Sequence, residues 1–238
     1  VVYQVIPSTL SVFANYMNGF TNMAPKAEGR NNDLRTFDPE QANQWEGGVK
    51  MSALAGMFNA TVSYYNINVS NIVLTLADTE GFPLYSQGGK RYSRGIDAEI
   101  IATPVSGLNI MAGYGYNDSK LTESNSKDFV DRRPESAGPE HIANAWISYR
   151  FLTGTIKGFG IGFGGNYAGE NMVLNRVTTG VFTVPSYTVF NASLSYNAER
   201  FGIALKLDNI TNKDYYKGWS TLEPQMPPRV SGSATFKF

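Results

Sequence analysis

The sequence of 238 residues lacks cysteine, contains one histidine and shows no excess of charge of either sign. Without thiols the chain can form no disulfide framework, zinc finger or cysteine nucleophile. The single histidine, His141, cannot supply the ligand cluster that a metal site needs. The 20 Lys and Arg residues balance the 20 Asp and Glu residues. This balance excludes the strong positive field that is typical of a nucleic-acid-binding protein.

The sequence also lacks a run of about 18 apolar residues, so it predicts no membrane-spanning helix. A strand of a membrane barrel needs only about 9–11 residues with every second one apolar. That period of two recurs along the chain. Successive side chains of a strand point to opposite faces, so each such segment has one apolar and one polar or small face. In the last segments we expect Ile203, Leu205, Ala234 and Phe236 to face lipid, and Ser233, Thr235 and Lys206 to face the lumen.

The period predicts ten strands, at 9–18, 42–52, 57–68, 89–102, 107–118, 140–151, 157–169, 186–197, 201–211 and 229–238. Short connections at 53–56, 103–106, 152–156 and 198–200 alternate with long ones at 19–41, 69–88, 119–139, 170–185 and 212–228. Short periplasmic turns alternating with long extracellular loops are typical of a transmembrane barrel. We therefore predict an all-β, antiparallel transmembrane β-barrel, with residues 1–238 as one region that has no internal domain boundary.

Tyrosines near the predicted strand ends agree with a membrane barrel, because a tyrosine ring is apolar and its hydroxyl is wet. The alternative is that tyrosine simply favours strands. The tyrosines concerned are Tyr16, Tyr64, Tyr92, Tyr116, Tyr149, Tyr167, Tyr187 and Tyr196. Residues 1–5 have the character of a strand end. Because open sheet edges cannot exist in lipid, we expect the start of the protein to lie upstream.

The glycines of residues 160–165 formally fit the pattern of a dinucleotide-binding fold, which requires a helix after them. Here they continue a strand. We interpret the segment as a strand whose inner face is stripped of side chains, so that a plug, a loop or a neighbouring aromatic can lie against the wall. A water-filled lumen explains the predicted inward charges without acid–base chemistry. These charges are Glu46, Lys50, Asp97, Glu99, Lys206 and Asp208.

An enzymatic alternative is a serine hydrolase with His141 as its base, but no serine stands in a nucleophile-elbow pattern. We therefore predict no catalytic residues. The long loops are rich in aromatic and basic side chains, which suit capture of an anionic or aromatic ligand. The alternative is that surface loops vary freely. The candidate ligand contacts are Arg132, Arg133, His141, Met172, Arg176, Tyr215, Tyr216 and Trp219.

Five segments, in order along nearly the whole chain, share the character of known strand and turn signatures. They are residues 44–50 (QWEGGVK), 92–99 (YSRGIDAE), 139–146 (PEHIANAW), 207–216 (LDNITNKDYY) and the final strand from Pro228 to Phe238. Together they resemble the C-terminal barrel portion of TonB-dependent outer-membrane receptors. One departure is Trp45, where that family often has tyrosine. The sequence as a whole is most similar to the siderophore-receptor branch of that family, of the kind found in Bacteroidetes.

The resemblance implies about ten C-terminal strands of a barrel of about 22 strands, closed by an N-terminal plug that this sequence does not contain. It implies a location in the outer membrane of a Gram-negative bacterium, in contact with lipid, and Phe238 as a terminal assembly signal. The expected activity is import of a ferric siderophore, energised by the TonB complex through the plug, with no cofactor and no enzymatic step. Alternatives are a receptor for cobalamin, haem or a glycan, an outer-membrane hydrolase or a passive pore. Haem capture would usually need more than one histidine.

Overall fold

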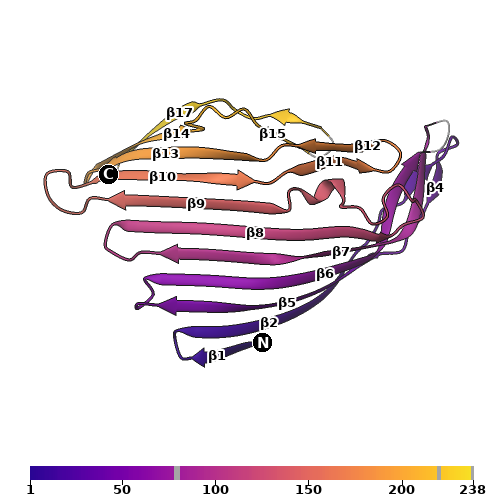
Figure 1. The fold of residues 1–238 in the computed structure, drawn as a ribbon, viewed down its shortest axis with the longest axis horizontal. Helices are drawn as coiled ribbons and strands as arrows, with labels where there is room; N and C mark the ends of the chain where they lie inside the picture. Colours follow the sequence, from indigo (N-terminus) through magenta and orange to yellow (C-terminus); the bar gives the residue numbers. More distant parts are fainter. Residues whose placement is uncertain (78–80, 219–220, 237–238) are drawn as a thin grey trace.

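The computed structural model describes residues 1–77, 81–218 and 221–236, which contain 17 β-strands. Eleven of them form one curved antiparallel sheet in the order β1-β2-β5-β6-β7-β8-β9-β10-β13-β14-β17 (Figure 1). The strands are β1 (Val2–Ile6), β2 (Leu10–Thr21), β5 (Glu40–Ala53), β6 (Phe58–Ala77), β7 (Pro83–Ala102), β8 (Leu108–Glu123), β9 (His141–Arg150), β10 (Phe159–Ala168), β13 (Tyr187–Asn197), β14 (Phe201–Asp208) and β17 (Arg229–Phe236). Within the described residues β1 and β17 each pair with one neighbour, so the sheet has two open edges.

All ten predicted strands are present, and β1 accounts for the strand character of residues 1–5. The short turns lie on the left in Figure 1 and the other connections on the right, which confirms the predicted alternation except at 69–88. No helix among the described residues is long and apolar enough to cross a membrane.

The prediction of a long loop at 69–88 was wrong, because β6 and β7 continue through most of it. Asn71 has a positive φ of 61° and the β6–β7 register shifts between Val69 and Ile72. Such a bulge interrupts the apolar alternation, although the strand resumes after it. The residues that follow are Ile72, Val73 and Leu74, and β-branched side chains favour strand.

The strand predicted at 201–211 ends earlier, at Asp208. Asn209 adopts a φ of 52°, in the left-handed region that asparagine tolerates. Its Oδ1 accepts a hydrogen bond from the Lys213 amide at 2.8 Å, and its Nδ2 donates to the Met226 carbonyl. This local side-chain bonding replaces the ladder and terminates the strand.

The long connections carry structure of their own. Three contain small hairpins, which are β3 (Lys26–Glu28) with β4 (Asp33–Arg35), β11 (Asn171–Arg176) with β12 (Gly180–Val184), and β15 (Tyr216–Lys217) with β16 (Glu223–Pro224). The connection at 124–140 contains the short helix η1 (Glu135–Ala137). The sequence did not indicate these elements, because pairs of two to six residues are too short to show a period.

The register gives the sheet one apolar and one polar face. Cross-strand partners share a face, and one row reads Val12, Val49, Val62, Ala98 and Tyr114. The adjacent row reads Ser11, Lys50, Thr61, Glu99 and Gly113 and lies on the other face. We call these the apolar face and the polar face. The apolar face is open, since Val62 and Tyr114 are 49% and 43% exposed.

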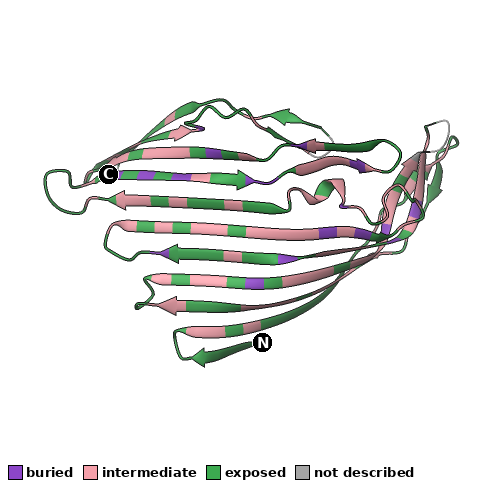
Figure 2. Cartoon of the chain, viewed as in Figure 1, coloured by how far each residue is buried: buried purple, intermediate pink, exposed green. Residues whose placement is uncertain are grey.

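Buried positions are scattered along the strands and do not gather into a core (Figure 2). A sheet of a soluble protein covers its apolar face with a second layer. Here the exposed apolar side chains cover one whole face, which is the arrangement of a wall that meets an apolar medium.

The predicted assignment of the last strands to two faces is confirmed. Ile203 pairs with Ala234 and Leu205 with Gly232, whereas Gly202 pairs with Thr235 and Ala204 with Ser233 on the opposite face. The six predicted inward charges also lie on the polar face. Tyr187 differs from the other rim tyrosines, because its position in β13 faces the polar side. Trp219 and Phe238 lie outside the described residues.

The interpretation of the glycine segment is confirmed as well. Gly162 and Gly164 of β10 lie on the polar face, and no helix follows them. The indole of Trp146 on β9 covers both, because a methyl group at either glycine would lie within 2.6 Å of the indole. The stripped strand thus makes room for a neighbouring aromatic.

Candidate functional site

A hollow of about 350 Å³ lies on the polar face at the end of the sheet that carries the long connections. We call it the mouth hollow. It is bounded by β6, β7 and β8 and by the connection at 124–140. Its apolar floor contains Ile72 and Leu121, which are 8% and 5% exposed, and the Phe129 ring.

Two arginines stand on either side of this floor. Leu121 is the register partner of Arg91 on β7 and forms an isolated bridge with Arg132. The Leu121 amide donates to the Arg132 carbonyl at 3.0 Å. Because paired residues have Cβ atoms about 4.5–5.5 Å apart, both arginines flank one buried leucine. Both line the mouth hollow and are half-buried.

Neither arginine has a carboxylate partner among the described residues. Arg132 donates from Nη1 to the neutral Asn175 Oδ1 at 2.7 Å. Arg91 makes no side-chain hydrogen bond or ion pair within the part of the chain that the structure describes. The sequence analysis missed Arg91. Its place on the polar face could have been predicted, because Arg91 stands six positions before Asp97 in the same strand. Residues an even number of positions apart in a strand lie on the same face.

Two carboxylates also border the mouth hollow, and both are already engaged. The Glu40 Oε1 accepts a hydrogen bond from the Val73 amide at 3.1 Å. Glu135 accepts from Arg176 Nε at 2.9 Å and from the Asn175 amide at 3.2 Å. The hollow is therefore apolar at its floor and carries two guanidinium groups that have no anionic partner.

Arg133, the neighbour of Arg132, has a different role. It is 9% exposed and donates to the Gly138 carbonyl from Nε and Nη2, and to the Asn117 carbonyl from Nη1 at 2.8 Å. Burial lowers the pKa of Arg133, an effect that Glu140 opposes. The guanidinium stays charged, because arginine is not deprotonated in proteins. Its donors hold the 124–140 connection against β8, so it serves as part of the frame.

The positive charge of Arg176 is balanced by the Glu135 carboxylate. Its hydrogen bond and ion pair with Glu135 raise the pKa of Arg176, and its guanidinium lies 5.2 Å from the Phe129 ring centre. Close by, Asp128 accepts from the Thr178 amide at 2.7 Å. Together these contacts join the β11–β12 hairpin to the 124–140 connection, and the two form one body beside the mouth hollow.

A second cluster lies on the polar face at the ends of β13, β14 and β17, beside a hollow of about 390 Å³. The rings of Tyr187 and Tyr215 are 4.5 Å apart, and Lys217 lies 5.8 Å from the centre of the Tyr215 ring. Below them Asp208 binds Lys206 at 2.7 Å and Arg229 at 3.1 Å. Lys217 is a further residue that the sequence analysis missed.

The remaining candidates lie apart from these clusters. His141 is the register partner of Tyr116 on the apolar face, and its Nδ1 is 2.8 Å from the Tyr114 hydroxyl. Met172 pairs with Thr183 in the β11–β12 hairpin, and Tyr216 is 48% exposed. A ligand role for these three residues stays a prediction, as it does for Trp219.

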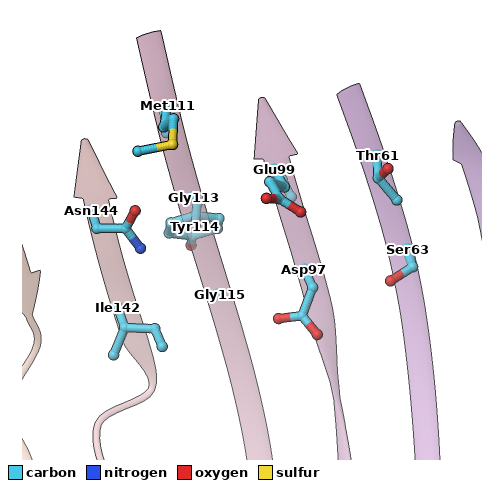
Figure 3. Close-up of a pocket in the computed structure, with 12 residues that line it drawn as sticks. Thr61, Ser63, Asp97, Glu99, Met111, Gly113, Tyr114, Gly115, Ile142 and Asn144 are labelled. Atoms are coloured by element: carbon cyan, nitrogen blue, oxygen red, sulfur yellow. The ribbon is translucent and has the colours of Figure 1, made fainter. Parts of the chain in front are cut away.

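A third hollow, of about 420 Å³, lies lower on the wall (Figure 3). Asp97 and Glu99 on β7 face it, beside the hydroxyls of Thr61 and Ser63 on β6 and the amide of Asn144 on β9. No group of three or more potential metal ligands occurs among the described residues. The carboxylates of this wall hollow can accept hydrogen bonds from donors that lie against the wall.

Comparison with known proteins identifies relatives that share this architecture. The ferrichrome outer membrane transporter/phage receptor of Escherichia coli is 29% identical over 188 residues, which are 77% of this chain and 24% of that protein. The ferrioxamine B receptor of Salmonella typhimurium is 26% identical over 215 residues, or 88% of this chain and 29% of that protein. The structure of Pseudomonas aeruginosa FpvA bound to heterologous pyoverdines superposes with a TM-score of 0.81 at 20% identity, covering 100% of this chain and 32% of that one.

The chain thus spans about a quarter to a third of the length of these relatives. The likeness to FpvA shows the fold of this chain. The profile of the family described as "TonB dependent receptor-like, beta-barrel" matches residues 1–210. The chain therefore belongs to the TonB-dependent receptor family, whose members are outer-membrane transporters of Gram-negative bacteria and not enzymes, and it forms part of the β-barrel.

Proposed function

We propose that the complete protein is an outer-membrane receptor that binds a ferric siderophore and imports it with energy supplied through TonB. The observation that carries this proposal is the mouth hollow, where Arg91 and Arg132 flank an apolar floor without a carboxylate partner. The names of the relatives, a ferrichrome transporter and a ferrioxamine B receptor, support the same class of cargo.

The chemistry of the cargo fits this end of the sheet. Ferric siderophores are compact and present carbonyl, catecholate or hydroxamate oxygens. A guanidinium offers a planar set of donors to such oxygens. The Tyr187–Tyr215 pair adds rigid contact area with polar tips, at small entropic cost. In this proposal Arg132, Tyr215 and the newly found Arg91 contact the ligand, and Arg133 and Arg176 hold the loops that present it.

The described sheet has two open edges, and unpaired strand edges are not tolerated in lipid. We propose that residues 1–238 are one uninterrupted region and that further strands of the same receptor complete the barrel. A plug that contacts TonB would then fill the lumen against the polar face. The ferric siderophore is the transported ligand, and the proposal includes no resident cofactor.

Whole-cell uptake tests this function. The complete receptor is expressed as the only import route in a strain that lacks its own siderophore receptors, and radiolabelled iron is supplied on a panel of siderophores. We expect saturable uptake of at least one ferric siderophore, and its loss when TonB is deleted. The proposal fails if no ferric siderophore enters and labelled cobalamin, haem or an oligosaccharide is taken up instead. TonB-independent, non-saturable leakage of all solutes would indicate a passive pore.

A further inference from the structure

The mouth hollow has a definite charge balance. Five charged side chains border it closely, which are Arg91, Arg132, Arg133, Glu40 and Glu135. Glu135 is neutralised by Arg176 at 2.9 Å, and Arg133 is turned into the protein, where its donors reach the Gly138 and Asn117 carbonyls. Glu40 accepts from the Val73 amide at 3.1 Å. The open space therefore meets two guanidinium groups and one carboxylate, none of them in an ion pair within the described chain, and its net charge is positive.

We infer, building on the proposed function, that the mouth hollow selects ferric complexes of net negative charge, and that Arg91 and Arg132 determine this specificity. An anionic complex with carboxylate or catecholate oxygens would give both guanidinium groups the anionic hydrogen-bond partner that they lack within the described chain. A volume of about 350 Å³ is within the range of small-molecule sites.

The discrimination comes from what happens when the wrong ligand enters. A half-buried charge that loses water and gains no partner is costly, and one that gains a carboxylate or catecholate oxygen is stabilised. A neutral trihydroxamate complex would cover Ile72, Leu121 and Phe129 and strip water from the two arginines, and its oxygens would offer only the weaker hydrogen bonds of a neutral complex in return. Removal of one charge-assisted hydrogen bond changes affinity by about tenfold to a hundredfold.

The two arginines belong to different parts of the chain. Arg91 is on the wall strand β7, whereas Arg132 is in the 124–140 connection, which Arg133 and the Asp128–Thr178 contact hold in place. An anion that binds both would link this connection to the wall. Because each arginine contributes separately, the two substitutions are expected to weaken binding of an anionic complex individually.

The test uses the complete receptor in detergent and two ferric complexes, a strongly anionic tricatecholate and a neutral trihydroxamate. Dissociation constants are measured by fluorescence quenching at low and high salt for the unmodified protein, Arg91→Gln and Arg132→Gln. The matched control is Arg94→Gln, which removes the same charge from the same strand on the apolar side, where Arg94 pairs with Asp118 at 2.9 Å. Heat-modifiable gel mobility verifies that each barrel is folded.

We expect the tricatecholate to bind at least tenfold more tightly than the trihydroxamate. Arg91→Gln and Arg132→Gln should each weaken tricatecholate binding about tenfold or more and leave trihydroxamate binding unchanged or tighter, because the desolvation cost of the charge is removed, with Arg94→Gln unchanged for both. Preference for the trihydroxamate would overturn the inference and leave the siderophore function standing. Tricatecholate selectivity that is unaffected by both substitutions would overturn the role of the two arginines. If neither complex nor any other ferric siderophore binds, the proposed function itself falls.

Discussion

The indole of Trp146 lies over Gly164, its direct partner across the β9–β10 ladder. A methyl group at Gly164 would lie 2.5 Å from Cε3 of Trp146 and would collide with the Ala145 carbonyl oxygen. The same relationship recurs on the polar face between Phe13 and Gly48 and between Tyr65 and Gly95. These three inward aromatic rings thus lie along the wall, because each faces a glycine.

Gly164→Ala should therefore destabilise the folded barrel by about 1–3 kcal/mol, the usual cost of overpacking. The obstructing Ala145 carbonyl is backbone and cannot rotate away. Gly19→Ala is the matched control, since a methyl group there meets no atom within 4 Å. Urea titration of the complete receptor in lipid vesicles, followed by gel mobility, measures both variants. Equal midpoints would show that the wall relaxes around the methyl group.

The sequence was sufficient for the wall because one physical rule governs it. A period of two places Leu205 and Lys206 on opposite faces whatever the rest of the fold, so the strands and the two faces could be predicted. The period of two does not predict the structure of the loops. The β3–β4 hairpin has only three residues in each strand and is held by contacts distant in sequence, since Glu28 accepts from the Tyr85 amide and Arg35 donates to the Tyr85 carbonyl at 2.6 Å.

The candidate site shows the same limit. Arg132 and Arg133 are adjacent, chemically identical and both at the mouth hollow, yet Arg132 is half-buried and Arg133 is buried against β8. Only the three-dimensional position of the Asn117 and Gly138 carbonyls separates the two roles. Arg91 was overlooked for a related reason. It belongs to a regular strand, and its significance depends on Arg132, which lies 41 positions further along the chain.

Substitutions on the two faces of the last strands should differ in cost. Leu205→Arg places a charge on the apolar face and should destabilise the barrel by about 2–4 kcal/mol if the position lies near the middle of the bilayer. Ser233 lies at a similar height on the polar face, one residue from Gly232, the partner of Leu205, so Ser233→Arg places the same charge on the other face. It should change the free energy of unfolding much less. Denaturant titration in vesicles gives both values, and similar losses would contradict the assignment of the faces.

Arg133→Met should loosen the 124–140 connection without affecting the rest of the sheet. The half-buried Gly138 and Asn117 carbonyls would lose their donor, and a fully buried carbonyl without a partner costs roughly 1–3 kcal/mol, which is the upper limit for each. Arg132→Met removes one hydrogen bond, to Asn175. Amide hydrogen exchange followed by mass spectrometry should show faster exchange over 124–140 in Arg133→Met and little change in Arg132→Met. The reverse order would mean that Arg132 is the framing residue.

The hydrogen bonds between Asp128 and Thr178 should hold the two loops together until the pH falls below the ordinary pKa of an aspartate. The backbone hydrogen bond from Thr178 is the main cause that lowers the pKa of Asp128, and the Thr178 hydroxyl adds to it. A carboxylate with a lowered pKa stabilises the joined state above its ordinary pKa of about 3.9, and this contribution is lost as the pH falls through the lowered value.

Exchange of the Thr178 amide should therefore be equally protected at pH 7 and pH 5, after correction for the intrinsic rate. Asp128→Asn should reduce that protection at both pH values, because an amide oxygen is a weaker acceptor than a carboxylate. Asp131→Asn, which alters an exposed carboxylate in the same connection, is the control and should have no effect. A loss of protection between pH 7 and pH 5 in the unmodified receptor would show that another titrating group holds the two loops together.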